Sequence, residues 1–111
     1  MNIKSTNYII ELSIFAEDDL KSSFEFYQNK SNLLAKGFIT QINKLFDKIT
    51  HSPFIYSPLH GNVRKANVAK YPFVIYFRID SYRIEVLAIF HSRRNPNTLI
   101  ARSIPREILE E

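Results

Sequence analysis

The sequence contains no cysteine and only two glycines among its 111 residues. The lack of cysteine excludes disulfides, thiolate zinc sites and thiol nucleophiles. The scarcity of glycine argues against a glycine-rich phosphate-binding loop. No apolar run approaches the roughly 18 residues needed to span a bilayer, and no stretch has the order of a secretory leader. We therefore expect a cytoplasmic protein without a membrane segment.

Apolar material is plentiful in this chain. Hydrophobic residues make up 45% of it and aromatic residues 14%, including nine phenylalanines and six tyrosines. That is enough to bury one core in a chain of this length, and it excludes an intrinsically disordered protein. With no repeat, low-complexity tract or linker, residues 1–111 are expected to form a single domain.

Charge is distributed unevenly along the sequence. The formal net charge is +4 and the isoelectric point about 9.4. Residues 1–60 carry six basic and six acidic side chains, whereas residues 61–102 carry eight basic and two acidic ones, a net of +6. The last nine residues contribute −2. A one-sided excess of this size indicates an anionic partner, either nucleic acid or an acidic protein. The alternative is a basic sheet face that is simply solvated.

The neutral half predicts one strand and two helices. Residues 8–12 are mainly β-branched and aromatic, as is typical of a strand. Ser13 and Ser31 stand where helix N-caps are expected, each before an amphipathic stretch. The first helix is predicted to end near Asn29, and the second before Pro53, because a residue that precedes proline avoids helical dihedrals. The predicted apolar stripes are Ala16, Leu20, Phe24 and Tyr27, then Leu34, Phe38, Ile42, Leu45 and Ile49.

The basic half predicts three strands. Residues 52–62 contain two prolines and a glycine and are expected to form a loop. Strands are predicted over 63–69, 73–79 and 83–91, with a turn at 80–82. In the last strand, alternation places Ile84, Val86, Ala88 and Phe90 on one face, and its apolar middle indicates a central position in the sheet. From Asn95 the chain is expected to be a loop, with a short helical turn around 106–109.

These elements predict an α+β fold. Its order is an N-terminal strand, an antiparallel helical hairpin and a three-stranded antiparallel meander, βααβββ, with the helices packed on one sheet face. The short link between the helices requires the hairpin, and the short links between the last strands favour the meander.

The segment from His91 to Pro96 is the first candidate for chemistry. It leaves the sheet directly after a buried strand, which holds its first residues on a rigid element. A histidine beside Arg93 and Arg94 suits phosphate recognition, and the same set supports general acid–base cleavage of RNA with arginine on the phosphate. The alternative is a strand-end histidine bonded to the backbone, beside solvated arginines.

Other candidates lie on the preceding strands. Arg64 and Lys65 are placed so that a basic residue there could converge on His91 across the sheet, or could be an ordinary exposed charge. Tyr71 and Tyr76 suit base stacking or proton donation, but such aromatics more often belong to a core. The three histidines lack the spacing of metal ligands, so we expect no metal and no cofactor.

Five segments, taken in order, carry a resemblance to a known family. They are Tyr8–Ser13 with Ala16, Asp19 and Leu20; Phe38, Ile42 and Ile49 with Pro53; Val63–Arg64; Tyr71–Phe77; and Ile84–Phe90 leading into His91, Arg94 and Pro96. Together they resemble the RelE/ParE superfamily, the toxins of bacterial type II toxin–antitoxin (plasmid-stabilisation) modules, and are most similar to its ParE-like branch.

The resemblance implies a toxin that a cognate antitoxin protein neutralises by wrapping an extended or helical segment over its apolar and basic surface. It also implies one of two targets. ParE-like members act on DNA gyrase and are not hydrolases, whereas RelE-like members cleave messenger RNA in the ribosome. The site residues implied are Arg64, Lys65, His91, Arg93, Arg94 and Pro96 for binding the target or antitoxin, and His91, Arg64 and Arg94 for a nuclease.

The sequence departs from the RelE pattern at two places. Only Lys65 and Lys70 are available as the lysines of that branch, and no tyrosine follows His91. The resemblance therefore favours a gyrase-directed toxin that is not an enzyme. A ribosome-dependent endoribonuclease and a non-toxic member that only binds antitoxin are the alternatives.

Overall fold

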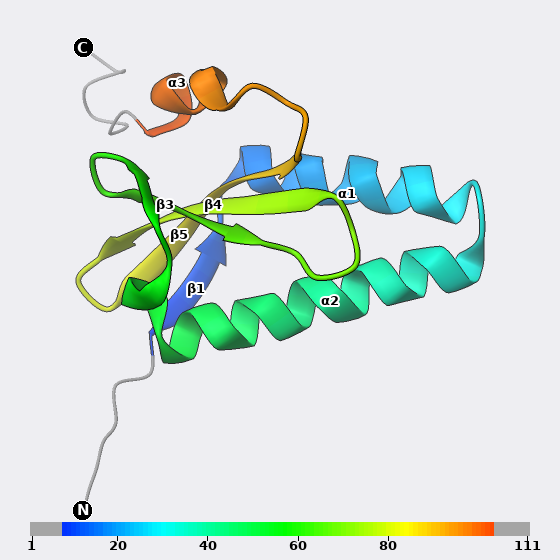
Figure 1. The fold of residues 1–111 in the computed structure, drawn as a ribbon, viewed down its shortest axis with the longest axis horizontal. Helices are drawn as coiled ribbons and strands as arrows, with labels where there is room; N and C mark the ends of the chain where they lie inside the picture. The colour runs from blue at the N-terminus through cyan, green and yellow to red at the C-terminus, as the bar shows by residue number, and fades with distance from the viewer. Residues whose placement is uncertain (1–7, 104–111) are drawn as a thin grey trace, which may run out of the picture.

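The computed structural model describes residues 8–103, which form five strands, three α-helices and two short 3₁₀ segments (Figure 1). Figure 1 shows a helical hairpin, α1 and α2, beside a sheet, with the short α3 at the other end of the chain. The elements are β1 (Ile9–Leu12), α1 (Ile14–Gln28), α2 (Asn32–His51), η1 (Pro53–Ile55), β2 (Pro58–His60), β3 (Val63–Asn67), β4 (Phe73–Asp80), β5 (Arg83–His91), η2 (Pro96–Thr98) and α3 (Leu99–Ser103).

Both long helices begin at the predicted caps. The Ser13 hydroxyl accepts the N–H of Ala16 at 3.1 Å, and the Ser31 hydroxyl accepts the N–H of Leu33 at 3.2 Å. Each bond satisfies an amide that would otherwise lack a partner in the first helical turn. One position of the predicted α2 stripe is wrong, because Leu34 is exposed and Ala35 is buried instead.

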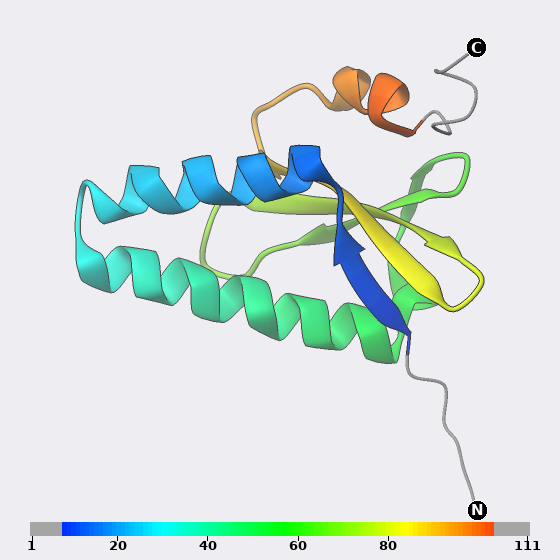
Figure 2. The same cartoon turned by 180° about the vertical axis from the view of Figure 1, so that it is seen from behind.

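The sheet order is β1-β5-β4-β3-β2, which confirms the predicted meander β3-β4-β5 and the central position of β5 (Figure 2). β1 runs parallel to β5 from the pair Ile9–Arg83 to the pair Leu12–Val86.

The prediction of a loop over 52–62 is wrong, because Pro58–His60 form β2 against β3 and Pro53–Ile55 form a 3₁₀ turn. A three-residue strand that begins with proline is too short to show a period-two pattern.

A β-bulge changes the direction of the side chains in β5. Tyr76 of β4 lies opposite Ala88, whereas the next residue, Phe77, lies opposite Val86. Leu87 is therefore an extra residue, and an extra residue reverses the alternation that follows it. The prediction that Val86 and Ala88 share a face is wrong for this reason. Val86 belongs to the core under the helices, whereas Ala88 faces the opposite side of the sheet.

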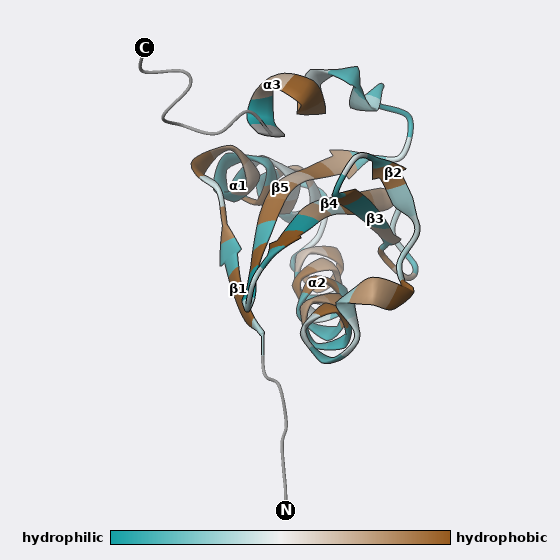
Figure 3. Ribbon diagram, turned by 90° about the vertical axis from the view of Figure 1, so that its left-hand side faces the viewer, coloured by the Kyte–Doolittle hydropathy of each residue, from teal (hydrophilic) through white to brown (hydrophobic). Residues whose placement is uncertain are grey.

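The larger core lies between the helical hairpin and one face of the sheet, as predicted. Phe38, Ile49, Ile75 and Phe77 have no exposed side-chain surface. In Figure 3 the apolar side of α2 faces the strands and its polar side faces away. A smaller cluster on the other sheet face includes Leu87 and Phe90, together with Leu99 of α3.

The tail after β5 is more ordered than the sequence indicates. The prediction of a loop from Asn95 is wrong, because η2 and α3 occupy residues 96–103 and bury Leu99. The helical turn predicted around 106–109 lies outside the described residues. Within the described part of the chain, no helix has the length and apolar character needed to cross a bilayer.

Candidate functional site

His91 closes β5 and is held by its neighbours on both sides. Its ring packs edge-on against Phe73, with 5.5 Å between ring centroids. The ring Nδ1 accepts the backbone N–H of Arg93 at 3.1 Å, and the His91 carbonyl accepts the N–H of Arg94 at 2.9 Å. Because Nδ1 is already an acceptor, the neutral ring carries its proton on Nε2. His91 can therefore offer a ligand one donor.

Arg94 follows in the same turn and stacks on an aromatic ring. Its guanidinium carbon lies 3.9 Å from the centroid of Phe90. A stacked guanidinium loses little freedom when it binds, and its N–H edge remains available to an anion. No carboxylate among residues 8–103 forms an ion pair with Arg94.

Of three further predicted residues, Arg93 and Pro96 lie in the same turn as these two and Lys65 does not. Arg93 is exposed. Pro96 is half-buried and opens η2, where the Asn95 side chain caps the N–H of Asn97 at 3.0 Å. Lys65 is exposed on β3, opposite Tyr76. The turn from His91 to Pro96 is therefore a compact basic corner, and Lys65 lies two strands from it.

Arg64 does not join this corner, and it does not converge with His91 across the sheet. Arg64 lies opposite Phe77 of β4, whereas His91 lies opposite Phe73, four residues or about 13 Å along the strand. Its Nη1 instead donates to the Tyr56 carbonyl at 2.6 Å, and its guanidinium lies over the Phe54 ring, 5.3 Å from the centroid. Arg64 thus ties η1 and the residue that follows it to the sheet.

Replacing Arg64 with alanine should therefore lower the stability of the fold more than it weakens binding at the basic corner. Loss of a bond from a charged donor to a part-buried carbonyl, together with the ring contact, should cost about 1–2 kcal/mol. We expect the urea midpoint to fall, while Lys65→Ala, an exposed neighbour, leaves it unchanged. A midpoint for Arg64→Ala equal to that of the parent would contradict this structural role.

An ion pair that the sequence did not reveal joins α1, β5 and α3. The Arg102 Nη1 lies 2.7 Å from the Asp19 carboxylate, and the two side chains are only 14% and 10% exposed. Asp19 also accepts the N–H of Ile89 at 3.0 Å, and Arg102 donates to the Leu87 carbonyl at 3.1 Å. These two backbone groups lie on the edge of β5 beyond the end of β1. Their pairing has no local sequence signal, since the two residues are 83 positions apart.

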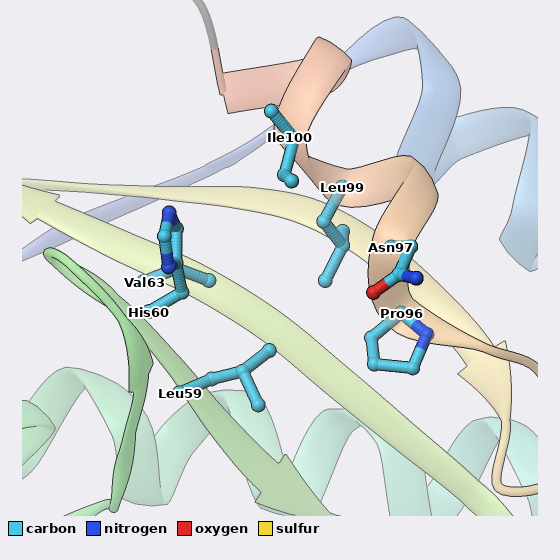
Figure 4. Close-up of a pocket in the computed structure, with 7 residues that line it drawn as sticks. All are labelled: Leu59, His60, Val63, Pro96, Asn97, Leu99 and Ile100. Atoms are coloured by element: carbon cyan, nitrogen blue, oxygen red, sulfur yellow. The ribbon is translucent and has the colours of Figure 1, made fainter.

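Three grooves surround the basic corner. One, of about 230 Å³, lies between β2–β3 and α3 and is lined by Leu59, Val63 and Leu99, with Pro96 at its end (Figure 4). A second, of about 410 Å³, lies between α1 and the end of β5 and includes His91. A third, of about 800 Å³, lies between the start of α1 and α3. Arg94 lines both the second and the third.

The side chains whose pKa departs from its ordinary value lie away from this corner. Burial raises the pKa of Tyr76, Tyr56 and Tyr27, and for Tyr27 the nearby Tyr71 adds to the effect. The half-buried Tyr71 packs against the core and donates to the Leu34 carbonyl at 2.9 Å, and Tyr76 is 6% exposed, so the core role expected for both is confirmed. The hydrogen bond and charge of Glu11 raise the pKa of Arg83.

The basic corner offers stacked and exposed guanidinium groups and one imidazole donor beside apolar grooves. Among the described residues, no group of three histidine or acidic side chains is placed to hold a metal ion.

Comparison with known sequences gives a family and a small set of relatives. The family model for the ParE toxin of the type II toxin–antitoxin system parDE matches residues 10–96. Toxin ParE2 of Mycobacterium tuberculosis, in two strains, is 26% identical over 89 residues, which cover 77% of this chain and 82% of that protein.

Solved structures share the fold. The chromosomal ParDE toxin–antitoxin system from P. aeruginosa aligns with a TM-score of 0.68 at 18% identity, over 78% of this chain and 98% of that one. The toxin–antitoxin complex RelBE2 from Mycobacterium tuberculosis aligns with a TM-score of 0.53 at 17% identity, over 79% and 94%. The fold, the order of the motifs and the family match over residues 10–96 agree: the chain belongs to the ParE toxin family of type II toxin–antitoxin systems.

Proposed function

We propose that the protein is a toxin that a cognate antitoxin holds inactive, and that once free it binds DNA gyrase rather than cleaving nucleic acid. The basic corner at His91–Pro96 is its proposed contact with the target. Lys65, two strands away, extends the same basic half.

The separation of Arg64 from His91 is the observation that supports binding over hydrolysis. The nuclease considered above would use His91 as the acid–base group, with Arg64 and Arg94 together on one phosphate. Here Arg64 bonds the Tyr56 carbonyl at 2.6 Å, and His91 uses Nδ1 to accept the Arg93 N–H. Of the two arginines considered for that nuclease, Arg64 and Arg94, Arg94 alone lies in the same turn as His91.

Purified protein should inhibit the supercoiling of relaxed plasmid by gyrase, and it should leave ribosome-bound messenger RNA intact. Agarose gels of plasmid topoisomers measure the first, and primer extension on a translated message measures the second. Cleaved message with normal supercoiling would contradict the proposal and favour the endoribonuclease. Growth without any defect on expression would favour a non-toxic member that binds antitoxin only.

The variant His91→Ala separates contact from catalysis. Removal of a general acid–base group typically slows a reaction by about 10²–10⁴-fold. If His91 only contacts the target, the concentration needed for half-inhibition of gyrase should rise by less than about tenfold, the usual scale for one polar contact. Ser92→Ala, in the same turn, is the matched control.

A further inference from the structure

β1 is an edge strand of the sheet. Within residues 8–103 it pairs only with β5, and in Figure 3 it runs along the rim of the molecule. The Ile9 N–H donates to the Tyr82 carbonyl on the β5 side at 2.9 Å. Because alternate residues of a strand direct their backbone groups to opposite sides, those of Ile10 and Leu12 point away from β5. A row of such groups is a template for another strand.

The side chains along this edge are apolar and incompletely covered. Tyr8, Ile10 and Leu12 are half-buried and pack against the core under the helices. On the other face Ile9 is 51% exposed, and Ile14, which opens α1 directly after the strand, is 74% exposed. A second strand laid along this edge would cover these side chains and extend the core.

The other end of β1 also carries exposed apolar side chains. The Phe54 ring packs edge-on against Tyr8, with 6.5 Å between ring centroids, and Phe54 is 61% exposed. Tyr82, beside the start of β1, is 61% exposed as well. Edge strands are usually protected by charged residues or proline, whereas the only charged residue of β1 is Glu11. This edge is therefore weakly protected against pairing.

The charges around β1 nearly cancel, in contrast to those of the basic corner. Glu11 pairs with Arg83, and Glu85 pairs with Arg78. Asp80 lines a groove with Glu11, Arg83 and Glu85. Three acidic and two basic side chains leave a net of −1. An acidic segment gains no attraction here, and a second copy of the chain meets little of the repulsion that a net charge of +4 produces elsewhere.

The position of Glu11 selects the register in which two β1 strands can pair. In a symmetric dimer the strands run antiparallel, and each contact occurs twice. A twofold axis at Glu11 places two carboxylates directly opposite each other, which is destabilising. With the axis at Ile10, the two Ile10 residues exchange backbone hydrogen bonds, and Glu11 lies opposite Ile9 of the second copy.

The axis at Ile10 also brings opposite ends of the two strands together. Leu12 of one copy lies opposite Tyr8 of the other. The exposed Ile14, two residues beyond Leu12, thereby comes to the end of the second copy where Phe54 is exposed. Each copy supplies the apolar cover that the other lacks, so the edge is complementary to itself.

We infer that the chain forms a symmetric dimer in which its β1 strands pair antiparallel about Ile10 and join the two sheets into one. The basic corner stays open in this dimer, because His91 lies five residues beyond Val86, the last β5 residue paired with β1. The dimer contact is therefore separate from the proposed contact with the target.

Sedimentation of the full chain over a range of concentrations measures the dimer. Ile10→Pro removes the N–H that bonds the second copy. In the monomer this N–H points away from β5, a position where an edge strand accepts proline. Because the bond occurs twice and the Ile10 side chain is lost as well, we expect the dissociation constant to rise by about 30-fold or more. Circular dichroism checks that the variant folds.

Two charges placed at Ile9 test the register, and they serve also if Ile10→Pro does not fold. Ile9→Glu puts a carboxylate opposite Glu11 of the second copy, whereas Ile9→Lys puts an ammonium group there. Since the contact occurs twice, the Ile9→Glu dimer should dissociate about tenfold more readily than the Ile9→Lys dimer. Adding Glu11→Lys to Ile9→Glu should remove this difference. Leu33→Glu, at a residue that is 80% exposed near the start of α2, is the control and should leave the parental dissociation constant unchanged.

Amide hydrogen exchange followed by NMR locates the contact. The N–H groups of Ile10 and Leu12 should be protected at concentrations where the dimer forms and should exchange freely below them. The N–H of Ile9 is bonded to Tyr82 within each copy, so its protection should not follow the dimer.

Four results would overturn the inference, and each points elsewhere. A chain that stays monomeric at about 1 mM has no such dimer. A dimer that neither Ile10→Pro nor Ile9→Glu weakens uses another surface. Protection of Ile10 and Leu12 that appears only when antitoxin or gyrase is added gives the edge to that partner. Protection of both at every concentration would show that the same chain covers its own edge.

Discussion

Replacing Asp19 with alanine should lower the free energy of unfolding by about 3 kcal/mol or more, the scale for removing one partner of a buried ion pair. The change leaves the Arg102 guanidinium, 14% exposed, without its carboxylate. It also removes the acceptor of the Ile89 N–H, which lies at the edge of β5. Two buried donors lose a partner at once, and water has little access to replace it.

The neighbouring acid provides a matched control. Asp18 is exposed and has the same side chain one position earlier in α1, so Asp18→Ala should change the unfolding free energy by less than about 0.5 kcal/mol. Urea unfolding followed by circular dichroism measures both variants. A midpoint for Asp19→Ala that matches that of Asp18→Ala would show that the ion pair contributes nothing.

A double replacement shows whether the effect comes from the pair. In Asp19→Leu/Arg102→Met neither charge remains, so the cost of an unpaired buried charge disappears. We expect this variant to be more stable than Asp19→Ala, since apolar residues of similar volume often replace a buried pair without loss. Non-additive changes in the free energy of unfolding would identify the two side chains as one unit.

The two long helices could be predicted because their signals are local. A serine cap, a four- or three-residue apolar spacing and a following proline or short link are all read from neighbouring positions. The sequence signals of strands β4 and β5 are equally clear, since each strand is a run of apolar and β-branched residues. These elements are consistent in sequence and structure because propensity and burial favour the same conformation.

The elements that were missed depend on distant contacts. The five residues of α3 are too few to form a stable helix alone, and the burial of Leu99 and the Arg102–Asp19 pair hold them in place. β2 is defined by its pairing with β3. The bulge at Leu87 depends on the register with β4, which no single strand encodes.

Only part of the candidate site could be predicted, because the other part also depends on distant contacts. His91, Arg93, Arg94 and Pro96 are close in sequence, so their turn brings them together whatever the rest of the fold does. Arg64 reaches the site only if the register between β3, β4 and β5 allows it, and the register places it opposite Phe77. Residues that are close in sequence are brought together by one turn, whereas the cross-strand neighbours of a residue depend on the register of the sheet, which only the structure shows.

Replacing Gly37 with alanine is the second change for which we expect a large effect on stability. It lies inside α2, where glycine normally costs about 1 kcal/mol relative to alanine. A Cβ at this position would overlap the hydroxyl oxygen of Tyr71. That hydroxyl donates to the Leu34 carbonyl, and the Tyr71 ring packs against Tyr27 and Phe38, with centroids 5.1 and 5.5 Å away. Movement of the ring away from the added Cβ would disturb these contacts and the hydrogen bond to Leu34.

Gly37→Ala should consequently destabilise the protein by about 2 kcal/mol, because overpacking and the lost Tyr71 hydrogen bond exceed the gain in helix propensity. In a Tyr71→Phe background, the effect of Gly37→Ala on stability should change sign. The nearest ring atom, Cζ of Tyr71, is 3.5 Å from the added Cβ, an ordinary contact, so alanine then stabilises the helix by up to about 1 kcal/mol. Thermal unfolding of the four proteins of this cycle measures the coupling. If alanine lowers the melting temperature equally in both backgrounds, the tyrosine hydroxyl is not the reason that residue 37 is glycine.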